Sequence, residues 1–330
     1  MKKFIKITSF VLIVAVIYLY MGMVFMPKTI TDAGGSKYYG AISYKYEPKN
    51  SIDVMFYGNS DVYSGISPME IYRKTGITSY GCGAAKQTLG AIYKQLKFTL
   101  RTQTPKVAVI DADCFYQANP PFGGTEMYDY AIVAAPFLYH SRWKELNPRD
   151  FVTFPTMNGK DNFLKGYHYS DKVYDYKVKD DFMADLSAMP KPLKKSVLKD
   201  FKKIHSLCRK NGIALSLITI PSPVSWDNAK SNGIKKLVSD YNKKFPDFEV
   251  GFYDMNLKLD GFDYSRCFRD RGNHCNYDGA MIVTSAVGQY LKDNYPSLHN
   301  PPERKNWHRL LGKYDDFIKN RNVQTVYEHK

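Results

Sequence analysis

The sequence predicts an α/β protein with a mostly parallel sheet, helices on both faces of that sheet and one transmembrane helix before it. Short apolar segments alternate with amphipathic segments from residue 51 to residue 295, and such alternation is typical of βαβ units. An uncharged run from Ile7 to Met26 precedes them. The 44% of hydrophobic and 24% of charged residues are ordinary for a protein that forms a core.

The N-terminal run has the length and flanking charge of a signal anchor. Its 20 residues would extend about 30 Å as a helix, enough to cross the hydrocarbon core of a bilayer. Lys2, Lys3 and Lys6 precede it, and lysines stay on the cytoplasmic side, so the rest of the chain should face outward. A cleaved signal peptide, the alternative, has a shorter apolar region of about 7–15 residues. We therefore expect residues 1–26 to form an uncleaved anchor in the cell membrane of a bacterium.

The remaining chain divides into a linker, an α/β domain and a tail. Residues 27–50 are polar and are expected to be a juxtamembrane linker, and residues 296–330 a polar tail with one candidate helix around Trp307 to Lys319. Residues 51–295 form the predicted domain, with an irregular insertion at about 115–190. Apolar runs predict strands at 52–57, 77–81, 106–112, 214–220 and 250–254. Amphipathic spacing predicts helices at 68–74, 87–102, 192–211 and 228–244 and a last one after residue 275.

The charge of the exported part indicates anionic surroundings. Residues 1–26 hold three lysines and no acidic residue, so the rest carries +12 of the net charge of +15. A basic surface outside the cell suits anionic lipid head groups or phosphate-rich wall polymers, although it can also serve solubility alone. Export argues against a nucleic-acid partner.

The cysteines predict neither a disulfide scaffold nor a metal site. Five are too few for such a scaffold, although Cys267 and Cys275 are close enough in sequence to pair outside the cell. A zinc site from these two and His274 would lack the usual C-x-x-C pair. We expect no metal and no cofactor.

Ser60 is the first candidate for chemistry because it directly follows the first predicted strand. Active sites of parallel sheets lie beyond the carboxyl ends of the strands. Gly58 permits a sharp turn there. The turn would raise the Ser60 hydroxyl above the sheet and place its N–H group where it could stabilise an oxyanion. The alternative role is a helix-capping serine.

His274 is the candidate base for that serine. A serine hydroxyl is a poor nucleophile until a base accepts its proton, and the usual base is an imidazole oriented by a carboxylate. Asp270 lies on the same predicted loop, immediately before the last helix, and Asn276 or Asp278 would cap that helix. The other six histidines lack this arrangement.

Three segments resemble conserved blocks of the SGNH/GDSL hydrolase superfamily. Residues 58–64 (GNSDVYS) resemble its first block, residues 80–88 its second and residues 274–280 (HCNYDGA) its last, within a similarity that covers roughly residues 51–295. The resemblance implies a flavodoxin-like SGNH fold in which Ser60 is the nucleophile, His274 the base and Asp270 its orienting carboxylate. It also implies oxyanion donors from the N–H groups of Ser60 and of Gly81 or Gly83.

The sequence departs from the pattern of this superfamily in two places. The aspartate usually stands three residues before the histidine, where this chain has Arg271, so the carboxylate could be Asp270 or Asp263, or be absent. The block Gly-x-Asn-Asp after the third strand is replaced at 111–113 by Asp-Ala-Asp. An ionised aspartate cannot donate to an oxyanion, which leaves the third donor open. Asp113, with Asn59 and Asp61, is instead a candidate for shaping the pocket.

Within the superfamily, the chain is most similar to membrane-anchored extracytoplasmic proteins. It resembles the D-alanyl transfer protein of teichoic acids and the alginate-type polysaccharide O-acetyltransferases. The resemblance implies an O-acyltransferase that modifies a cell-surface polysaccharide or teichoic-type polymer through a Ser60 acyl-enzyme, beside a membrane-bound O-acyltransferase as partner. An esterase or deacetylase with the same triad, and a non-catalytic scaffold, are the alternatives.

Overall fold

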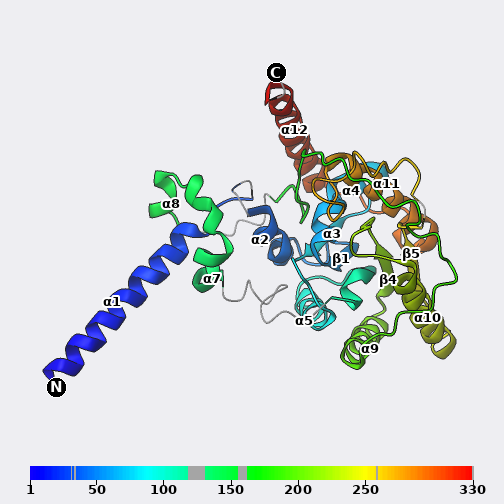
Figure 1. Cartoon of the computed structure of the whole chain (residues 1–330), viewed down its shortest axis with the longest axis horizontal. Helices are drawn as coiled ribbons and strands as arrows, with labels where there is room; N and C mark the ends of the chain where they lie inside the picture. Colours follow the sequence, from blue (N-terminus) through cyan, green and yellow to red (C-terminus); the bar gives the residue numbers. More distant parts are fainter. Residues whose placement is uncertain (31, 33–34, 118–130, 155–161, 258, 329–330) are drawn as a thin grey trace.

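One parallel sheet of five strands lies at the centre of the part of the chain after the N-terminal helix (Figure 1). The computed structural model describes residues 1–30, 32, 35–117, 131–154, 162–257 and 259–328. Its strands are β1 (Val54–Gly58), β2 (Ser79–Gly83), β3 (Val107–Asp111), β4 (Ala214–Thr219) and β5 (Val250–Asp254). The predicted α/β fold with a parallel sheet is confirmed, and the five predicted strands agree with the observed ones to within a few residues.

The order of the strands places a crevice beside β1. The sheet runs β2-β1-β3-β4-β5, so the chain moves to one side of β1 and then crosses to the other. In doubly wound sheets with this flavodoxin-like order, ligands bind at the carboxyl ends of the strands next to the reversal. The residues after β1 and β3 therefore occupy the favoured position for a site.

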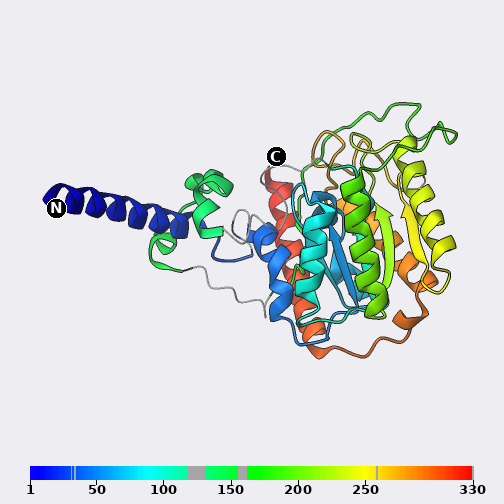
Figure 2. The same cartoon turned by 90° about the horizontal axis from the view of Figure 1, so that it is seen from below.

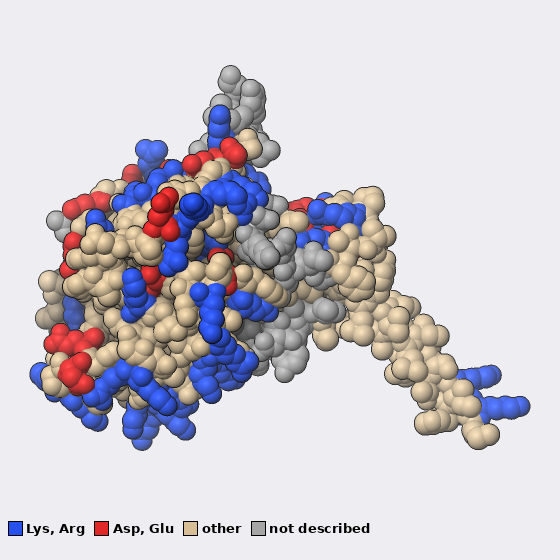
Figure 3. Space-filling model, turned by 180° about the vertical axis from the view of Figure 1, so that it is seen from behind, with Lys and Arg blue, Asp and Glu red and all other residues tan. Residues whose placement is uncertain are grey.

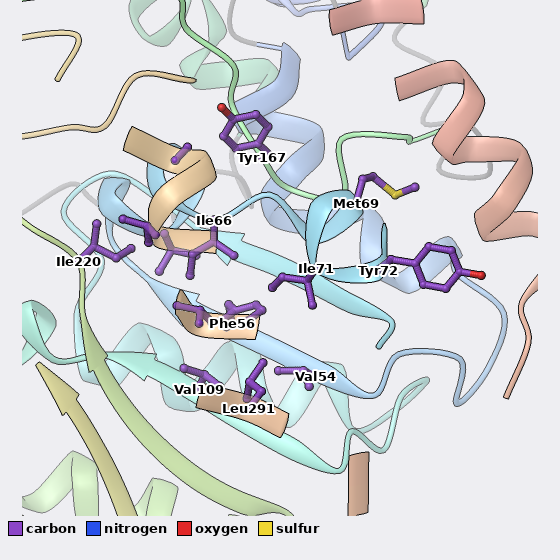
Figure 4. Packing of buried hydrophobic residues seen from close by; sticks show 14 of the residues in the cluster. Val54, Phe56, Ile66, Met69, Ile71, Tyr72, Val109, Tyr167, Ile220 and Leu291 are labelled. Carbon is purple, nitrogen blue, oxygen red and sulfur yellow. The ribbon is translucent and has the colours of Figure 1, made fainter. Parts of the chain in front are cut away.

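Helices cover both faces of the sheet, as predicted (Figure 2), and Figure 4 shows side chains buried on one of these faces. Side chains alternate along a strand, so Val54 and Phe56 pack into one buried cluster and Met55 and Tyr57 into the other. The first face is covered by α3 (Ser60–Gly65), α4 (Pro68–Thr75), α11 (Tyr277–Asn294) and α12 (Lys305–Glu328), and the second by α5 (Leu89–Thr99), α9 (Lys195–Lys210) and α10 (Asn228–Lys244).

The C-terminal segment is more ordered than a polar tail. After the 3-10 turn η5 (Pro296–Leu298), the candidate helix is observed as the longer α12. Trp307, Leu310 and Tyr314 are buried on it, at the spacing that places side chains on one face of a helix. This face joins the first core cluster, so the helix is part of the folded domain.

The N-terminal helix α1 (Lys2–Phe25) projects from the domain as a rod (Figures 1 and 3). Its most apolar window has a mean hydropathy of 2.3 and only 17% of that window is buried, and its length and composition suffice to cross a membrane. In Figure 3 the rod shows Lys and Arg only at its tip. A helix this exposed and apolar lacks the burial of a core helix.

Part of the predicted insertion packs against the C-terminal half of α1. It consists of α7 (Ala131–Leu138), the 3-10 turn η3 (His140–Lys144) and α8 (Pro148–Val152), which lie beside the end of the rod (Figure 1). The hydroxyl of Tyr18 donates to the Val133 carbonyl at 2.6 Å. The hydroxyl of Tyr20 donates to the Phe151 carbonyl at 3.0 Å. We call residues 131–154 the collar.

A buried arginine holds the collar to α1. The guanidinium of Arg142 donates to the carbonyls of Phe25 and Met26 at 2.9 and 2.7 Å. It also forms an ion pair with Asp150 at 3.0 Å. The last carbonyls of a helix lack partners within the helix and favour a cation, so Arg142 closes the end of α1 and fixes the collar to it.

The segment expected to be a linker is folded. Residues 27–50 contain α2 (Gly35–Ile42) and the 3-10 turn η1 (Ser43–Tyr46), and Tyr38 and Tyr39 on α2 are buried. Tyrosines have large apolar rings, and these two pack against Met26 and the collar residues Ala135 and Tyr139. The helix α2 also contacts β2, so it lies between α1 and the sheet (Figure 1).

Candidate active site

Ser60 is the first residue of α3, directly beyond the carboxyl end of β1. The side chain of Asn59 caps this helix by accepting the N–H of Asp61 at 2.7 Å. Gly58 is required at the turn, because a Cβ atom there would lie 2.4 Å from the side chain of Val62 and 2.6 Å from that of Asp111. The hydroxyl of Ser60 therefore stands half-exposed above the sheet, and Asn59, not Ser60, is the capping residue.

The loop before α11 orients His274. Asp270 accepts the backbone N–H groups of Asn273 and His274 through Oδ1, at 3.1 and 2.9 Å. Its other oxygen, Oδ2, lies 2.5 Å from Nδ1 of the imidazole. A carboxylate only accepts hydrogen bonds, so Nδ1 carries the proton and Nε2 is left as an acceptor. The side chain of Asn276 caps α11 and fixes the end of the loop.

The structure brings Ser60, His274 and Asp270 into one chain of hydrogen bonds. Nε2 of His274 lies 2.7 Å from the Ser60 hydroxyl, across 214 positions of sequence. Burial alone would raise the pKa of Asp270, but its hydrogen bonds with His274 and Asn273 lower that pKa below its ordinary value. The carboxylate is thus ionised where it faces the imidazole. This is the arrangement that a serine needs to lose its proton to a base.

A looped backbone explains how Asp270 works at the unusual spacing of four residues. Gly272 adopts a φ of +76°, a conformation that glycine takes without strain. Its N–H donates back to the Asp270 carbonyl at 2.7 Å. This turn accommodates the additional residue between Asp270 and His274, so the carboxylate still reaches the imidazole. Asp263, the alternative carboxylate, instead accepts hydrogen bonds from Ser265.

Of the proposed oxyanion donors, Gly81 does not fit. Its N–H donates to the Lys165 carbonyl at 2.8 Å, so it has no proton to offer a substrate, and that expectation was wrong. The sequence could not reveal this partner because Lys165 belongs to the irregular insertion. Gly83 lies at the end of β2, paired with Gly58, and a Cβ atom there would come within 2.8 Å of the Asn59 carbonyl. Gly83 and Ser60 remain the candidate donors.

The three candidate pocket residues lie beneath Ser60. Asn59, Asp61 and Asp113 are only 3–4% exposed. The side chain of Asn59 donates to Asp113 at 2.9 Å. Asp113 therefore accepts a hydrogen bond from the turn that carries Ser60, which explains an aspartate where the superfamily has an asparagine.

Three buried carboxyl groups form an acidic cluster behind the serine: Asp61, Asp111 and Asp113. Burial raises the pKa of Asp111, and the neighbouring Asp113 raises it further. Burial likewise raises the pKa of Asp61, with both other carboxyls adding to the effect. Asp111 Oδ2 has no hydrogen-bond partner among the described residues. The folded protein thus retains protons in this cluster that the unfolded chain would release.

This cluster predicts a stability that falls with rising pH. Above the ordinary pKa of an aspartate, about 3.9, the folded state binds more protons than the unfolded state, so the free energy of unfolding decreases as pH rises. One such carboxyl lowers the free energy of unfolding by up to about 1.4 kcal/mol for each pH unit. We expect Asp111→Asn to lose less stability than the wild type between pH 5 and pH 8, measured by urea unfolding in detergent micelles. The control is Asp185→Asn, which removes an exposed carboxylate; its free energy of unfolding should fall with pH as steeply as that of the wild type. An equally steep fall in Asp111→Asn would contradict the prediction.

The site includes four side chains that sequence reasoning missed. Tyr63 and Arg269 lie near Ser60, and Lys37 and His168 come from α2 and from the insertion. Arg269 stands next to Asp270 in sequence and could have been suspected on that ground. No pattern marks Lys37 or His168, because neither belongs to a periodic segment.

The cysteines and metal-binding side chains do not form a second centre. Cys267 and Cys275 are buried and unpaired, and burial raises the pKa of both thiols. Within the described ranges, no group of three or more His, Cys, Asp or Glu side chains is placed to hold a metal ion.

Comparisons with known proteins found similar solved structures but no matching sequence family. No family model matches the chain, and no curated protein is similar to it. A putative acylhydrolase from Bacteroides fragilis is 11% identical with a TM-score of 0.40, covering 79% of this chain and 96% of that one. A GDSL-like lipase from Bacteroides thetaiotaomicron is 10% identical with a TM-score of 0.39, covering 78% and 98%. A family 3 carbohydrate esterase from Clostridium thermocellum is 14% identical with a TM-score of 0.41, covering 76% and 99%.

Proposed function

We propose that the protein is a membrane-anchored, extracytoplasmic O-acyltransferase that modifies a cell-surface polysaccharide or teichoic-type polymer through an acyl-enzyme on Ser60. The observation that carries this proposal is the hydrogen-bonded chain from Ser60 through His274 to Asp270, at 2.7 and 2.5 Å. These are short contacts between a nucleophile, a base and an orienting carboxylate, the combination used for acyl transfer.

In the first step, Ser60 takes an acyl group from an ester donor. The Ser60 oxygen attacks the carbonyl carbon while its proton moves to Nε2 of His274, and the ionised Asp270 stabilises the imidazolium that forms. The N–H groups of Ser60 and Gly83 are the candidate donors to the oxyanion, and each such donor contributes about 3–4 kcal/mol to lowering the barrier. When the intermediate collapses, the leaving alcohol takes the proton from His274.

In the second step, a hydroxyl group of the polymer resolves the acyl-enzyme. It gives its proton to His274, attacks the ester carbonyl and leaves with the acyl group, while the imidazolium returns a proton to Ser60. The same steps with water produce a free acid, which would make the protein an esterase or deacetylase.

The anchor and the collar support a site close to a membrane surface. Large apolar side chains of the collar are exposed around the end of α1: Phe137, Trp143, Phe151 and Val152. Exposed apolar and aromatic side chains beside a spanning helix suit the boundary between lipid and water. In that position the domain could receive acyl groups from a membrane-bound O-acyltransferase, the partner that the family resemblance implies.

An acyl-transfer assay tests the proposal. Full-length protein in detergent micelles is incubated with p-nitrophenyl acetate labelled in the acetyl group and with either poly(glycerol phosphate) or a neutral β-glucan. We expect acetyl label on a polymer, lost to background in Ser60→Ala. If only free acetate accumulates with both acceptors, while Ser60→Ala produces none, the protein is an esterase.

A further inference from the structure

Two cationic side chains lie over the ring of Tyr63, about one turn of α3 from Ser60, without a carboxylate partner among the described residues. Lys37 on α2 and Arg269, which precedes Asp270 on the loop before α11, are both half-buried. Neither forms an ion pair with any carboxylate that the structure describes, whereas Asp270 is already engaged by His274. Two like charges held close together each disfavour the charged form of the other. An anion that is not part of the chain would relieve this repulsion between the two cations.

Tyr63 brings these two cations together. Nζ of Lys37 lies 5.6 Å from the centre of its ring, and the guanidinium of Arg269 lies 6.0 Å from it. Arg269 is fixed there by a hydrogen bond to the Ser64 hydroxyl at 3.1 Å. Tyr63 and Ser64 are on α3, within about one turn of Ser60, so both positive charges lie close to the candidate nucleophile.

The electrostatics of the neighbouring groups agree with this geometry. Burial lowers the pKa of Lys37, and Arg269 lowers it further, as expected when no anion offsets the charge. His168, whose Nδ1 lies 2.7 Å from the Ser36 hydroxyl, has its pKa lowered to about 3 by burial, with Lys37 and Arg269 contributing. His168 is thus neutral, and the positive charge of the site comes from Lys37 and Arg269.

An open cavity lies against Arg269. It has a volume of about 650 Å³ and is lined in part by Ser36, His168, Arg269 and Asp270. The lining also includes three further carboxylates and two further cations, Asp32, Glu145, Asp171, Lys172 and Arg321, and Asp32 is held by Arg149 at 3.1 Å. Of the triad, only Asp270 lines the cavity, whose volume is large enough for a sugar or polyol unit with a charged substituent.

We propose that Lys37 and Arg269 form an anion-binding subsite that holds a phosphate or carboxylate group of the acyl acceptor beside Ser60. This inference rests on the proposed function for the role of the anion but not for its binding. An anionic group there would offset both cations and place a neighbouring hydroxyl of the same unit near the acyl-enzyme. The acceptor would accordingly be an anionic polymer, either a polyol phosphate or a uronic-acid glycan.

Binding to an inactive variant tests the subsite separately from the chemistry. Full-length Ser60→Ala protein in detergent micelles is titrated calorimetrically with sodium glycerol phosphate, sodium galacturonate and methyl galactoside, at constant ionic strength. We expect at least one anion to bind more tightly than the neutral galactoside, and the tighter of the two anions identifies the acceptor group. Adding Lys37→Met should weaken that binding about tenfold, and Lys37→Arg should largely restore it.

A matched lysine completes this design. Lys199→Met removes an exposed lysine on α9 and should leave anion binding unchanged. The subsite is overturned if neither anion binds more tightly than methyl galactoside, or if Lys37→Met and Lys199→Met bind equally well. Because the titration needs no turnover, a loss of acyl-transfer activity alone would contradict the proposed function and not the subsite.

Discussion

Alanine in place of Ser60 is expected to abolish covalent labelling by a fluorophosphonate, and glutamine in place of His274 to slow it by about 10⁴-fold. Labelling requires the serine oxygen to attack phosphorus, and the oxygen becomes nucleophilic only when Nε2 of His274, 2.7 Å away, accepts its proton. Residues of a triad act as a unit, and removal of the nucleophile or base costs several orders of magnitude. Asp270→Asn should slow labelling less, since it disturbs the orientation and charge of the base. Stopped-time labelling of full-length protein measures all three rates.

The control for this series is an ordinary exposed serine. Ser187 lies on the surface, where its hydroxyl donates to Asp185, and Ser187→Ala should be labelled at the wild-type rate. Persistent labelling of Ser60→Ala would show that another residue reacts. A folded wild-type protein that takes no label at all would favour the non-catalytic scaffold, because every enzymatic alternative needs an activated Ser60.

The periodic parts of the sequence were sufficient to predict the fold. Five apolar runs became the five strands because a buried parallel strand must be apolar on both faces. The segments around Ser60 and His274 lie at the carboxyl end of β1 and before α11, where a doubly wound sheet places its site. Asn59 and Asn276 cap the two helices beside them, so local turn chemistry and the position of the site agree.

The sequence could not predict the contacts made by segments without periodicity. Residues 27–50 and the insertion contain no regular apolar pattern, yet Lys37, Arg142 and Lys165 come from them. Arg142 binds the Met26 carbonyl across 116 positions of sequence and Lys165 binds Glu47 across 118. Whether the Gly81 N–H was available depended on the Lys165 carbonyl alone. Such contacts arise from the packing of side chains after the sheet has formed, and no local propensity encodes them.

Lys165 is the clearest instance of a contact that only the structure shows. Its side chain is fully buried and pairs with the equally buried Glu47 at 2.5 Å. Its ammonium also lies 4.8 Å from the centre of the Trp307 ring on α12. One side chain thus joins the insertion, the segment before β1 and the C-terminal helix.

Methionine at position 165 is expected to destabilise the protein by about 3–5 kcal/mol, because it leaves the Glu47 charge buried without its partner. Burial already raises the pKa of Glu47, with Lys165 acting against that rise. Without Lys165 the pKa rises further, so Glu47 stays protonated in the folded state over a wider pH range. Stability is then lost as pH rises above the unfolded pKa of a glutamate, about 4.3, and the defect should be larger at pH 8 than at pH 5.

The double variant Lys165→Met/Glu47→Gln separates charge from packing. Removing both charges of a buried pair costs much less than removing one, so the double variant should recover most of the lost stability, and its difference from the wild type should change little with pH. Lys165 has a φ of +47°, and methionine meets the same backbone constraint as lysine, so strain is matched in all variants. Urea unfolding in detergent micelles, followed by tryptophan fluorescence, measures each free energy. Equal losses in the single and double variants would mean that the lysine contributes through its packing against Trp307 and not through its charge.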